Sequence, residues 1–224
     1  MRMVDTLPAA VALPLPRAGV VLHGDLVVPD GARRLVVFAH GGGSSRRSPR
    51  NRRVAGRLQA AGLATLLFDL LTPEEAETDR RTASLRFDIP RLAFRLGGVL
   101  DLLATRPDTS GLEVALFGAS TGAAAALVVA AAQPGRVVSV VSRGGRPDLA
   151  GDALGRVRAP VLLLVGGADT AVLAMNRAAC AALPHARLEV VPGATHLFEE
   201  PGAMDRVVDA AVRWLATPAT VASG

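Results

Sequence analysis

Ser120 is the residue whose neighbours most clearly suggest chemistry, because it stands at the centre of Gly118-Ala119-Ser120-Thr121-Gly122. An apolar run at residues 113–117 precedes this segment and an alanine-rich helical pattern follows it, which is the context of a G-x-S-x-G nucleophile. The two glycines permit a tight strand-to-helix turn, and helix N–H groups beside it can stabilise developing negative charge. The alternative is an ordinary serine cap at a glycine-rich turn.

A nucleophilic serine needs a base, and the base needs a group that orients it. His196 and Asp169 each stand just beyond a strand-like run, in the chain order Ser, Asp, His that α/β-hydrolases use. We expect His196 within hydrogen-bonding reach of the Ser120 hydroxyl, with a carboxylate behind the imidazole. Asp169 is the first candidate for that carboxylate, and Asp148 is the second. Taken singly, Asp169 is typical of a helix cap and His196 of a surface loop.

Short β-branched or leucine-rich runs alternate with longer alanine- and arginine-bearing stretches. The expected strands are 20–28, 35–39, 64–69, 113–117, 137–141, 160–165 and 187–191. The expected helices are 49–61, 88–105, 120–132, 170–183 and 203–216. The alternation from residue 35 onward predicts an α/β fold, with a mostly parallel central sheet and helices on both faces. We also expect the first two strands to form an antiparallel hairpin through Pro29-Asp30-Gly31.

The length of 224 residues and the 50% of hydrophobic residues favour one domain with a substantial core. We expect a leader at residues 1–17, the domain at 18–216 and a tail at 217–224. Asp5 and the prolines of the leader argue against a signal peptide. Charged residues, glycine or proline interrupt every apolar run before it reaches the length of a membrane span. The sequence therefore predicts a cytoplasmic protein with no membrane partner.

The net charge of +5 gives little reason to expect a nucleic-acid partner. All 25 basic residues are arginine, aromatic residues make up only 3%, and no nucleic-acid-binding motif occurs. Cys180 is the one cysteine, and the four histidines show no ligand spacing, so neither a disulfide nor a metal site is expected. We expect no cofactor.

Three glycines, Gly41 to Gly43, precede the densest cluster of arginines, at residues 46–53. A Walker-type phosphate loop is excluded because it requires a lysine and the chain has none. Ser48 and Pro49 predict a helix start, which places arginines at the helix end that favours anions. We expect them to pair with an acidic loop at residues 74–79. The alternative is an anionic substrate held by an arginine, for which the candidates are Arg46, Arg86, Arg143 and Arg146.

The sequence resembles α/β-hydrolases of the dienelactone hydrolase-like group over residues 18–216. The resemblance is carried by the G-x-S-x-G segment and by His40-Gly41-Gly42-Gly43, Gly166-Gly167-Ala168-Asp169 and Gly193-Ala194-Thr195-His196. It implies an α/β-hydrolase fold without a large lid domain and a triad of Ser120, His196 and Asp169. It also implies an oxyanion hole made by the N–H groups of Gly42 and Thr121, with His40 bracing the loop.

One departure from this group bears on the activity. The enzymes that give the group its name use a cysteine nucleophile, whereas residue 120 is serine, which favours a serine esterase over dienelactone hydrolysis. Because residues 142–159 are too short for a helical lid, we expect an open site that cleaves small soluble esters or lactones through an acyl-enzyme. An acyltransferase and a non-catalytic binding protein on a hydrolase scaffold are the alternatives. A monomer and a homodimer both remain open.

Overall fold

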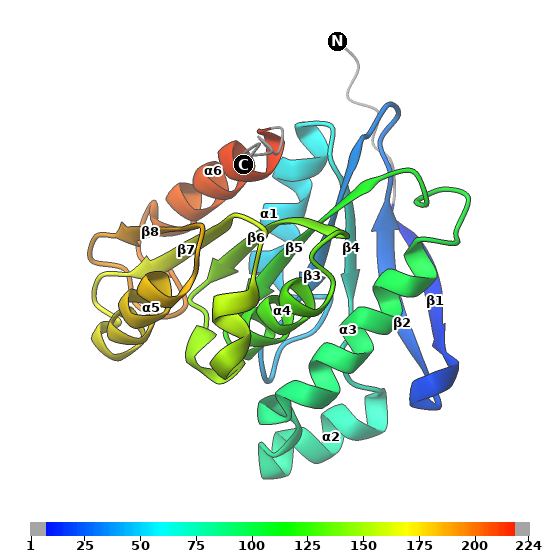
Figure 1. Ribbon diagram of the computed structural model, residues 1–224, viewed down its shortest axis with the longest axis horizontal. Coiled ribbons are helices and arrows are strands. Elements are labelled where there is room, and N and C mark those ends of the chain that lie inside the picture. The colour runs from blue at the N-terminus through cyan, green and yellow to red at the C-terminus, as the bar shows by residue number, and fades with distance from the viewer. Residues whose placement is uncertain (1–7, 218–224) are drawn as a thin grey trace.

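A single eight-stranded sheet runs through the molecule in the order β1-β2-β4-β3-β5-β6-β7-β8 (Figure 1). The structure is a computed structural model that describes residues 8–217. β2 pairs antiparallel with both β1 and β4, and every other neighbouring pair is parallel. The strands are β1 (Ala9–Leu15), β2 (Val20–Val27), β3 (Arg34–Ala39), β4 (Ala64–Phe68), β5 (Glu113–Ala119), β6 (Val137–Arg143), β7 (Val161–Gly166) and β8 (Ala186–Val191).

Helices cover both faces of this sheet, as the alternating sequence pattern predicts (Figure 1). α1 and α6 pack against one face, while α3 and α4 pack together against the other. Because the connection between β6 and β7 consists of short 3-10 turns over Pro147–Arg156, no large lid domain interrupts the described chain. The helices are α1 (Pro49–Ala60), α2 (Pro73–Thr82), α3 (Ile89–Leu103), α4 (Thr121–Ala132), α5 (Thr170–Ala182) and α6 (Ala203–Ala216).

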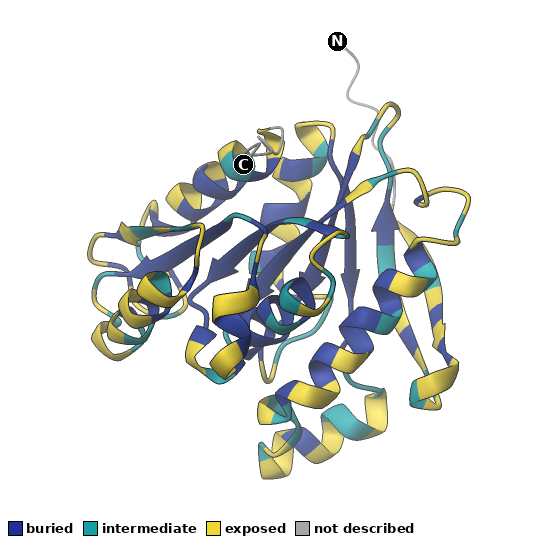
Figure 2. Cartoon of the chain, in the orientation of Figure 1, coloured by how far each residue is buried: buried dark blue, intermediate teal, exposed yellow. Residues whose placement is uncertain are grey.

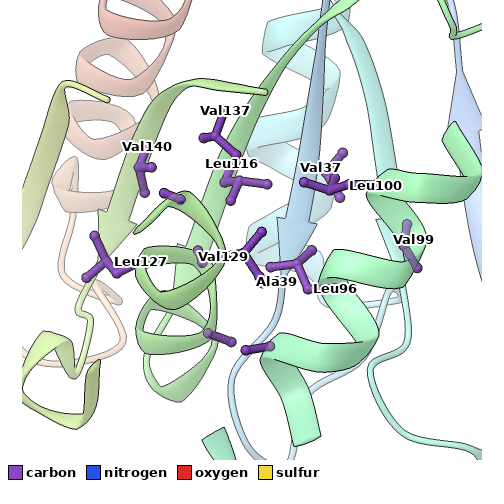
Figure 3. Packing of buried hydrophobic residues seen from close by; sticks show 14 of the residues in the cluster. Val37, Ala39, Leu96, Val99, Leu100, Leu116, Leu127, Val129, Val137 and Val140 are labelled. Atoms are coloured by element: carbon purple, nitrogen blue, oxygen red, sulfur yellow. The ribbon is translucent and has the colours of Figure 1, made fainter. Parts of the chain in front are cut away.

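The two faces of the sheet bury separate apolar layers, because successive strand residues point to opposite sides. In β3, Val37 and Ala39 face the layer under α3 and α4, whereas Val36 and Phe38 face the layer under α1 and α6. Figure 3 shows the first layer, in which Leu96 of α3 lies beside β3. β3 and β7 are buried along their whole length (Figure 2), which explains why central strands read as continuous apolar runs.

The predicted hairpin between the first two strands is wrong. A turn does form, with Ala32 N donating to Pro29 O at 3.1 Å. The chain then crosses to the far side of β4, where β3 pairs with β4 and β5 rather than with β2. β2 pairs with β4 on one side and with β1 on the other. β1 was not predicted either. Within the expected leader at residues 1–17, Ala9–Leu15 form this strand, whose edge position tolerates Pro14, while residues 1–7 lie outside the described residues.

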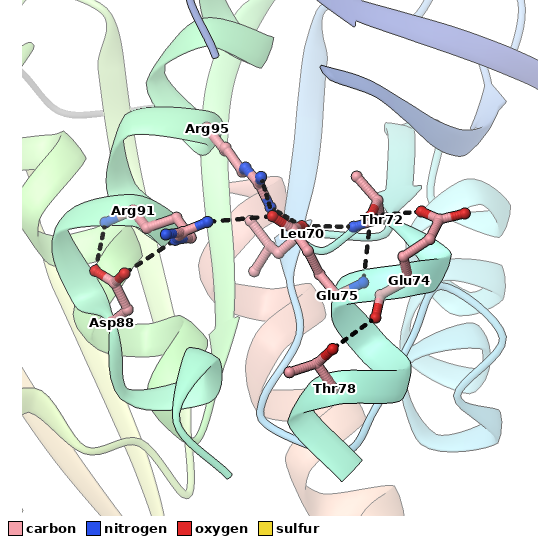
Figure 4. Close-up of polar contacts among 8 residues, drawn as sticks. All are labelled: Leu70, Thr72, Glu74, Glu75, Thr78, Asp88, Arg91 and Arg95. Atoms are coloured by element: carbon pink, nitrogen blue, oxygen red, sulfur yellow. Dashed lines mark hydrogen bonds and ion pairs between the residues drawn. The ribbon is translucent and has the colours of Figure 1, made fainter. Parts of the chain in front are cut away.

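The acidic loop predicted at residues 74–79 is also wrong, because this segment belongs to helix α2. Thr72 caps the helix, and its Oγ1 accepts a hydrogen bond from Glu75 N at 3.3 Å. Glu75 returns the bond, accepting from Thr72 N at 2.9 Å, so the two residues form a capping box (Figure 4). Pro73 occupies the first helical position. Thr-Pro-Glu-Glu was therefore a helix start signal in the sequence.

Other element boundaries agree with the sequence to within a few residues. The helix predicted at 49–61 begins at Pro49, and the Ser48 side chain accepts from Asn51 N at 3.4 Å, as a helix cap does. No helix within residues 8–217 has both the length and the apolar character that crossing a bilayer requires.

Candidate active site

Ser120 occupies a strained turn between β5 and α4. Its backbone has φ 49° and ψ −123°, a conformation that is favourable only for glycine and that costs a serine about 1–3 kcal/mol. The turn is possible because the residues two before and two after Ser120 are glycines, which lack side chains. A Cβ on Gly118 would lie 2.4 Å from Ala123 Cα, and one on Gly122 would lie 2.2 Å from Ala39 O. The tight turn leaves Ser120 half-buried at the carboxyl edge of the sheet.

Asp169 and His196 meet at the same edge. Asp169 follows β7 and His196 follows β8, and Nδ1 of the imidazole lies 2.7 Å from Asp169 Oδ2. The Asp169 side chain is 16% exposed and that of His196 is 40% exposed. Asp148, the second candidate for the acid, is bound to Arg146 at 2.7 Å. The geometry therefore favours Asp169 as the group that orients the imidazole.

Ser120 and His196 both lie near the end of β6, where Gly144 follows Arg143. Ser120 N donates to Arg143 O at 3.3 Å, and a Cβ on Gly144 would lie 3.6 Å from His196 Cε1. No hydrogen bond joins the Ser120 hydroxyl to His196 within residues 8–217, so the predicted contact is not formed. Catalytic hydrogen bonds are often long in the unliganded state and shorten only when substrate binds.

The loop after β3 approaches Ser120 closely. A Cβ on Gly41 would lie 2.8 Å from Ser120 Cβ, so only glycine allows this approach. The N–H groups of Gly42 and Thr121 donate to no other protein group within the described chain. Both residues line a cavity of about 410 Å³. The Thr121 hydroxyl is buried and has no hydrogen-bond partner within residues 8–217. These two N–H groups are the ones that the sequence analysis assigned to an oxyanion hole.

His40 connects this loop to the end of β4. Its Nε2 accepts a hydrogen bond from Leu70 N at 3.0 Å, so Nδ1 carries the proton and donates to Gly41 O at 2.9 Å. Burial lowers the pKa of His40 below its ordinary value, although the Gly41 carbonyl and the charge of Asp69 act in the opposite direction. A neutral imidazole can both accept and donate, as these two bonds require.

The arginine-rich segment does not pair with residues 74–79, which corrects the sequence-based expectation. Arg46 pairs with Asp69 and Asp25, and its backbone N donates to Asp69 Oδ1 at 2.7 Å. The arginines of α1 that pair with carboxylates reach Asp25 or the region of α6, because α1 packs against α6. These pairs are Arg50–Glu199, Arg52–Asp25, Arg53–Asp205 and Arg57–Asp209.

Three of the four candidate substrate-binding arginines already have carboxylate partners. Arg46 and Arg146 are paired as described, and Arg86 Nε donates to Asp79 at 2.9 Å. The Arg86 side chain covers Gly42, since a Cβ on that glycine would lie 2.6 Å from Arg86 Cδ. Arg143 has no salt bridge within residues 8–217. The structural role of Asp79 was not predicted from the sequence. Asp79 is buried in α2, and its hydrogen bonds to Arg86 fix that arginine over the loop.

A serine on a sharp turn after β5, an acid after β7 and a histidine after β8, all on a sheet of this strand order, define the α/β-hydrolase class. The chain belongs to the dienelactone hydrolase family, whose sequence model matches residues 22–219. It is similar to a crystal structure of dienelactone hydrolase from Anabaena variabilis, with 57% identity and a TM-score of 0.89 over 92% of this chain and 95% of that one.

More distant structures share the fold alone. Est1E from Butyrivibrio proteoclasticus has a TM-score of 0.75 at 17% identity, over 91% of this chain and 96% of that chain. Among curated proteins, two from strains of Mycobacterium tuberculosis, named provisionally as phosphoribosyl transferases, are each 58% identical over 205 residues. Those residues make up 91% of this chain but 44% of the relatives, so the chain spans less than half of their length.

Proposed function

We propose that the protein is a serine hydrolase that cleaves small esters or lactones through an acyl-enzyme on Ser120. The observation that carries this proposal is the strained backbone of Ser120, at φ 49°, because a serine used only as a helix cap has no need of it. The Asp169–His196 bond at 2.7 Å adds an oriented base beside the same turn.

In the proposed reaction, Ser120 Oγ attacks the substrate carbonyl while His196 Nε2 takes up the hydroxyl proton. Asp169 holds the proton on Nδ1 and stabilises the imidazolium that forms. The N–H groups of Gly42 and Thr121 bind the oxyanion, and each such donor contributes about 2.7–4 kcal/mol to transition-state stabilisation. His196 returns its proton to the leaving group. Water, deprotonated by the same imidazole, then releases the acyl group.

The short connection from β6 to β7, which forms only 3-10 turns, supports an open site and a small substrate. The cavity of about 410 Å³ is lined by Gly42 and Thr121 but not by Ser120, Asp169 or His196, so it adjoins the proposed reacting residues. Serine at position 120 favours general ester hydrolysis, because the enzymes for which the family is named use a cysteine. Transfer of the acyl group to an alcohol or thiol would use the same residues, so product analysis with added nucleophiles separates transfer from hydrolysis.

Phosphoribosyl transfer, which the names of the curated relatives mention, is not proposed for this chain. The match covers 44% of those proteins, and the matched part is the one that carries Ser120, Asp169 and His196. The name can therefore describe the part of those proteins that this chain does not span.

The proposal is tested with a fluorophosphonate probe and a short-chain aryl ester, applied to the wild type and to Ser120→Ala. We expect labelling and turnover in the wild type and neither in the variant. Ser110→Ala, in an exposed loop, is the matched control and should behave as the wild type. Turnover that persists in Ser120→Ala would place the reaction on another nucleophile. Absence of labelling and turnover in both proteins would favour a binding protein.

A further inference from the structure

Arg143 differs from the other buried arginines of the described chain in having no partner. Arg34 and Arg95 are likewise buried, but each donates to a glutamate and to a backbone carbonyl. The Arg143 side chain makes no salt bridge or hydrogen bond within residues 8–217, and its Nη1 is buried without an acceptor. Because an unpaired buried charge is destabilising, the fold gains nothing evident from an arginine here.

Arg143 ends β6, on the face of the sheet that α1 and α6 cover. Arg143 follows Val141 on the same face of β6, and Val141 packs in the apolar layer under α1 and α6. Arg50 pairs with Glu199, three residues after His196, and Gly144, which follows Arg143, lies close to the backbone of His196, so Arg143 and Arg50 lie at the same edge of the sheet. Burial and, secondly, the positive charge of Arg50 lower the pKa of Arg143 to about 10. At neutral pH the group remains charged.

The surroundings of Arg143 are positive on two counts. Arg50 Nε is buried without an acceptor. The one carboxylate that pairs with Arg50 within residues 8–217, that of Glu199, lies 3.4 Å away on a side chain that is 68% exposed. Such an exposed pair is weak and easily displaced. The N-terminus of α1 adds its own partial positive charge, with no acidic residue in the first turn. Asn51, in the same first turn of α1, is buried, and its Oδ1 has no partner within residues 8–217.

This cluster adjoins the reacting residues. Arg143 O accepts the hydrogen bond from Ser120 N, and the next residue, Gly144, contacts His196. A group bound between Arg143 and Arg50 would therefore lie at the same edge of the sheet as Ser120 and His196.

We propose that Arg143 and Arg50 bind a phosphate group of the ester or lactone substrate. This inference rests on the proposed function, because it places the phosphate on the molecule that Ser120 attacks. Two guanidinium groups and a helix N-terminus match a phosphate monoester, which carries between one and two negative charges at neutral pH. A carboxylate, with a single charge, would neutralise Arg143 alone and leave Arg50 with Glu199, whereas a phosphate has the charge and the oxygens to bind both guanidinium groups. Each guanidinium group can also donate two parallel hydrogen bonds, and a phosphate offers three terminal oxygens to accept them.

Binding is tested without turnover by titrating inorganic phosphate into Ser120→Ala, with acetate as the parallel ligand. We expect Arg143→Gln, added to this background, to weaken phosphate binding about 10-fold or more, since hydrogen bonds to charged groups are worth about 1.5–3 kcal/mol. Arg106→Gln removes an arginine paired with Asp108 and is the matched control, with unchanged binding. Undetectable phosphate binding at millimolar concentration, or equal binding with and without Arg143, would overturn the proposal. If acetate binding depended on Arg143 to the same extent, the site would be assigned to a carboxylate and the phosphate proposal would be wrong.

The substrate side is tested with two 4-nitrophenyl esters, one of phosphoglycolic acid and one of methoxyacetic acid. In Arg143→Gln, the ratio of kcat/KM for the phosphorylated ester to that for the neutral ester should fall about 10-fold. A purely structural arginine would change both esters alike and lower the unfolding temperature. A subsite arginine that is unpaired in the free protein should leave that temperature equal or higher. Loss of the ester activity in Ser120→Ala tests the proposed function separately from the phosphate titration.

Discussion

Asp169 Oδ2 lies 2.7 Å from His196 Nδ1, whereas the competing carboxylate, Asp148, is bound to Arg146. This relationship predicts which of the two carboxylates orients the imidazole for catalysis. Asp169→Asn should lower kcat for 4-nitrophenyl acetate about 10⁴-fold, because an amide favours the wrong imidazole tautomer while preserving shape. Asp148→Asn is the matched control and should retain most of the activity. A greater loss in Asp148→Asn than in Asp169→Asn would exchange the two assignments.

The strained turn at Ser120 predicts a gain in stability when function is removed. Glycine adopts φ 49° without steric cost, so Ser120→Gly should have a larger free energy of unfolding than Ser120→Ala. The difference should be about 1 kcal/mol, because relief of about 1–3 kcal/mol of strain is offset by the greater unfolded-state entropy of glycine. Urea unfolding of both inactive variants measures it. A less stable Ser120→Gly would show that the turn stores no such strain.

The central elements of the fold could be predicted from sequence because burial on both faces leaves a strong local pattern. β3 and β7 are continuous apolar runs, and the glycines around Ser120 mark the turn that their missing side chains allow. Asp169 and His196 were placed by the rule that functional residues follow the carboxyl ends of strands. These signals are local in the sequence, and reading them required no knowledge of which residues meet in the folded chain.

The partners of charged residues were not predictable in the same way. Arg46 was expected to pair with the acidic segment at 74–79, but it reaches Asp25 on β2 and Asp69 after β4. That choice depends on the order of the strands, and the order was mispredicted when β2 was paired with β3. The strand at Ala9–Leu15 was missed for a similar reason, because only the edge position of β1 makes Pro14 acceptable there.

His40 predicts a pH dependence of stability. Its lowered pKa in the folded protein means that, between that pKa and the ordinary value of 6.5, the unfolded chain binds a proton that the folded chain does not. The stabilisation is therefore complete above about pH 6.5 and is lost as the pH falls through this window, by up to about 1.4 kcal/mol per pH unit. Urea unfolding at pH 7.5 and 5.5 should show the fall in the wild type.

The fall should be smaller in His40→Gln, which cannot titrate. His185→Gln, which removes an exposed histidine, should keep the wild-type dependence. His40→Gln should also lower kcat, because the loop that carries Gly42 loses its bond from His40 Nδ1 to Gly41 O. An unchanged pH dependence in His40→Gln would mean that another group titrates in this range.

Arg95 fixes α2, which in turn lines the cavity beside Gly42. The Arg95 side chain is 4% exposed, and it donates to both carboxylate oxygens of Glu75 and to Leu70 O (Figure 4). Arg95→Met should reduce the free energy of unfolding by about 2–3 kcal/mol, somewhat less than for a fully buried pair, because Glu75 is partly exposed and retains Arg91. Glu75→Gln in the same chain should recover part of the loss.

The same pair predicts acid sensitivity. The hydrogen bonds from Arg95 hold the pKa of Glu75 below its ordinary value of 4.5, although burial opposes the shift. A lowered carboxylate pKa stabilises the folded protein above about pH 4.5 and ceases to do so as the pH falls through the folded-state pKa. The free energy of unfolding should therefore decline less between pH 5 and pH 3 in Arg95→Met than in the wild type. Since Ala76 of α2 and its cap Thr72 line the cavity wall, Arg95→Met should also raise KM for the aryl ester. A variant that loses stability with unaltered KM would show that the cavity does not hold the substrate.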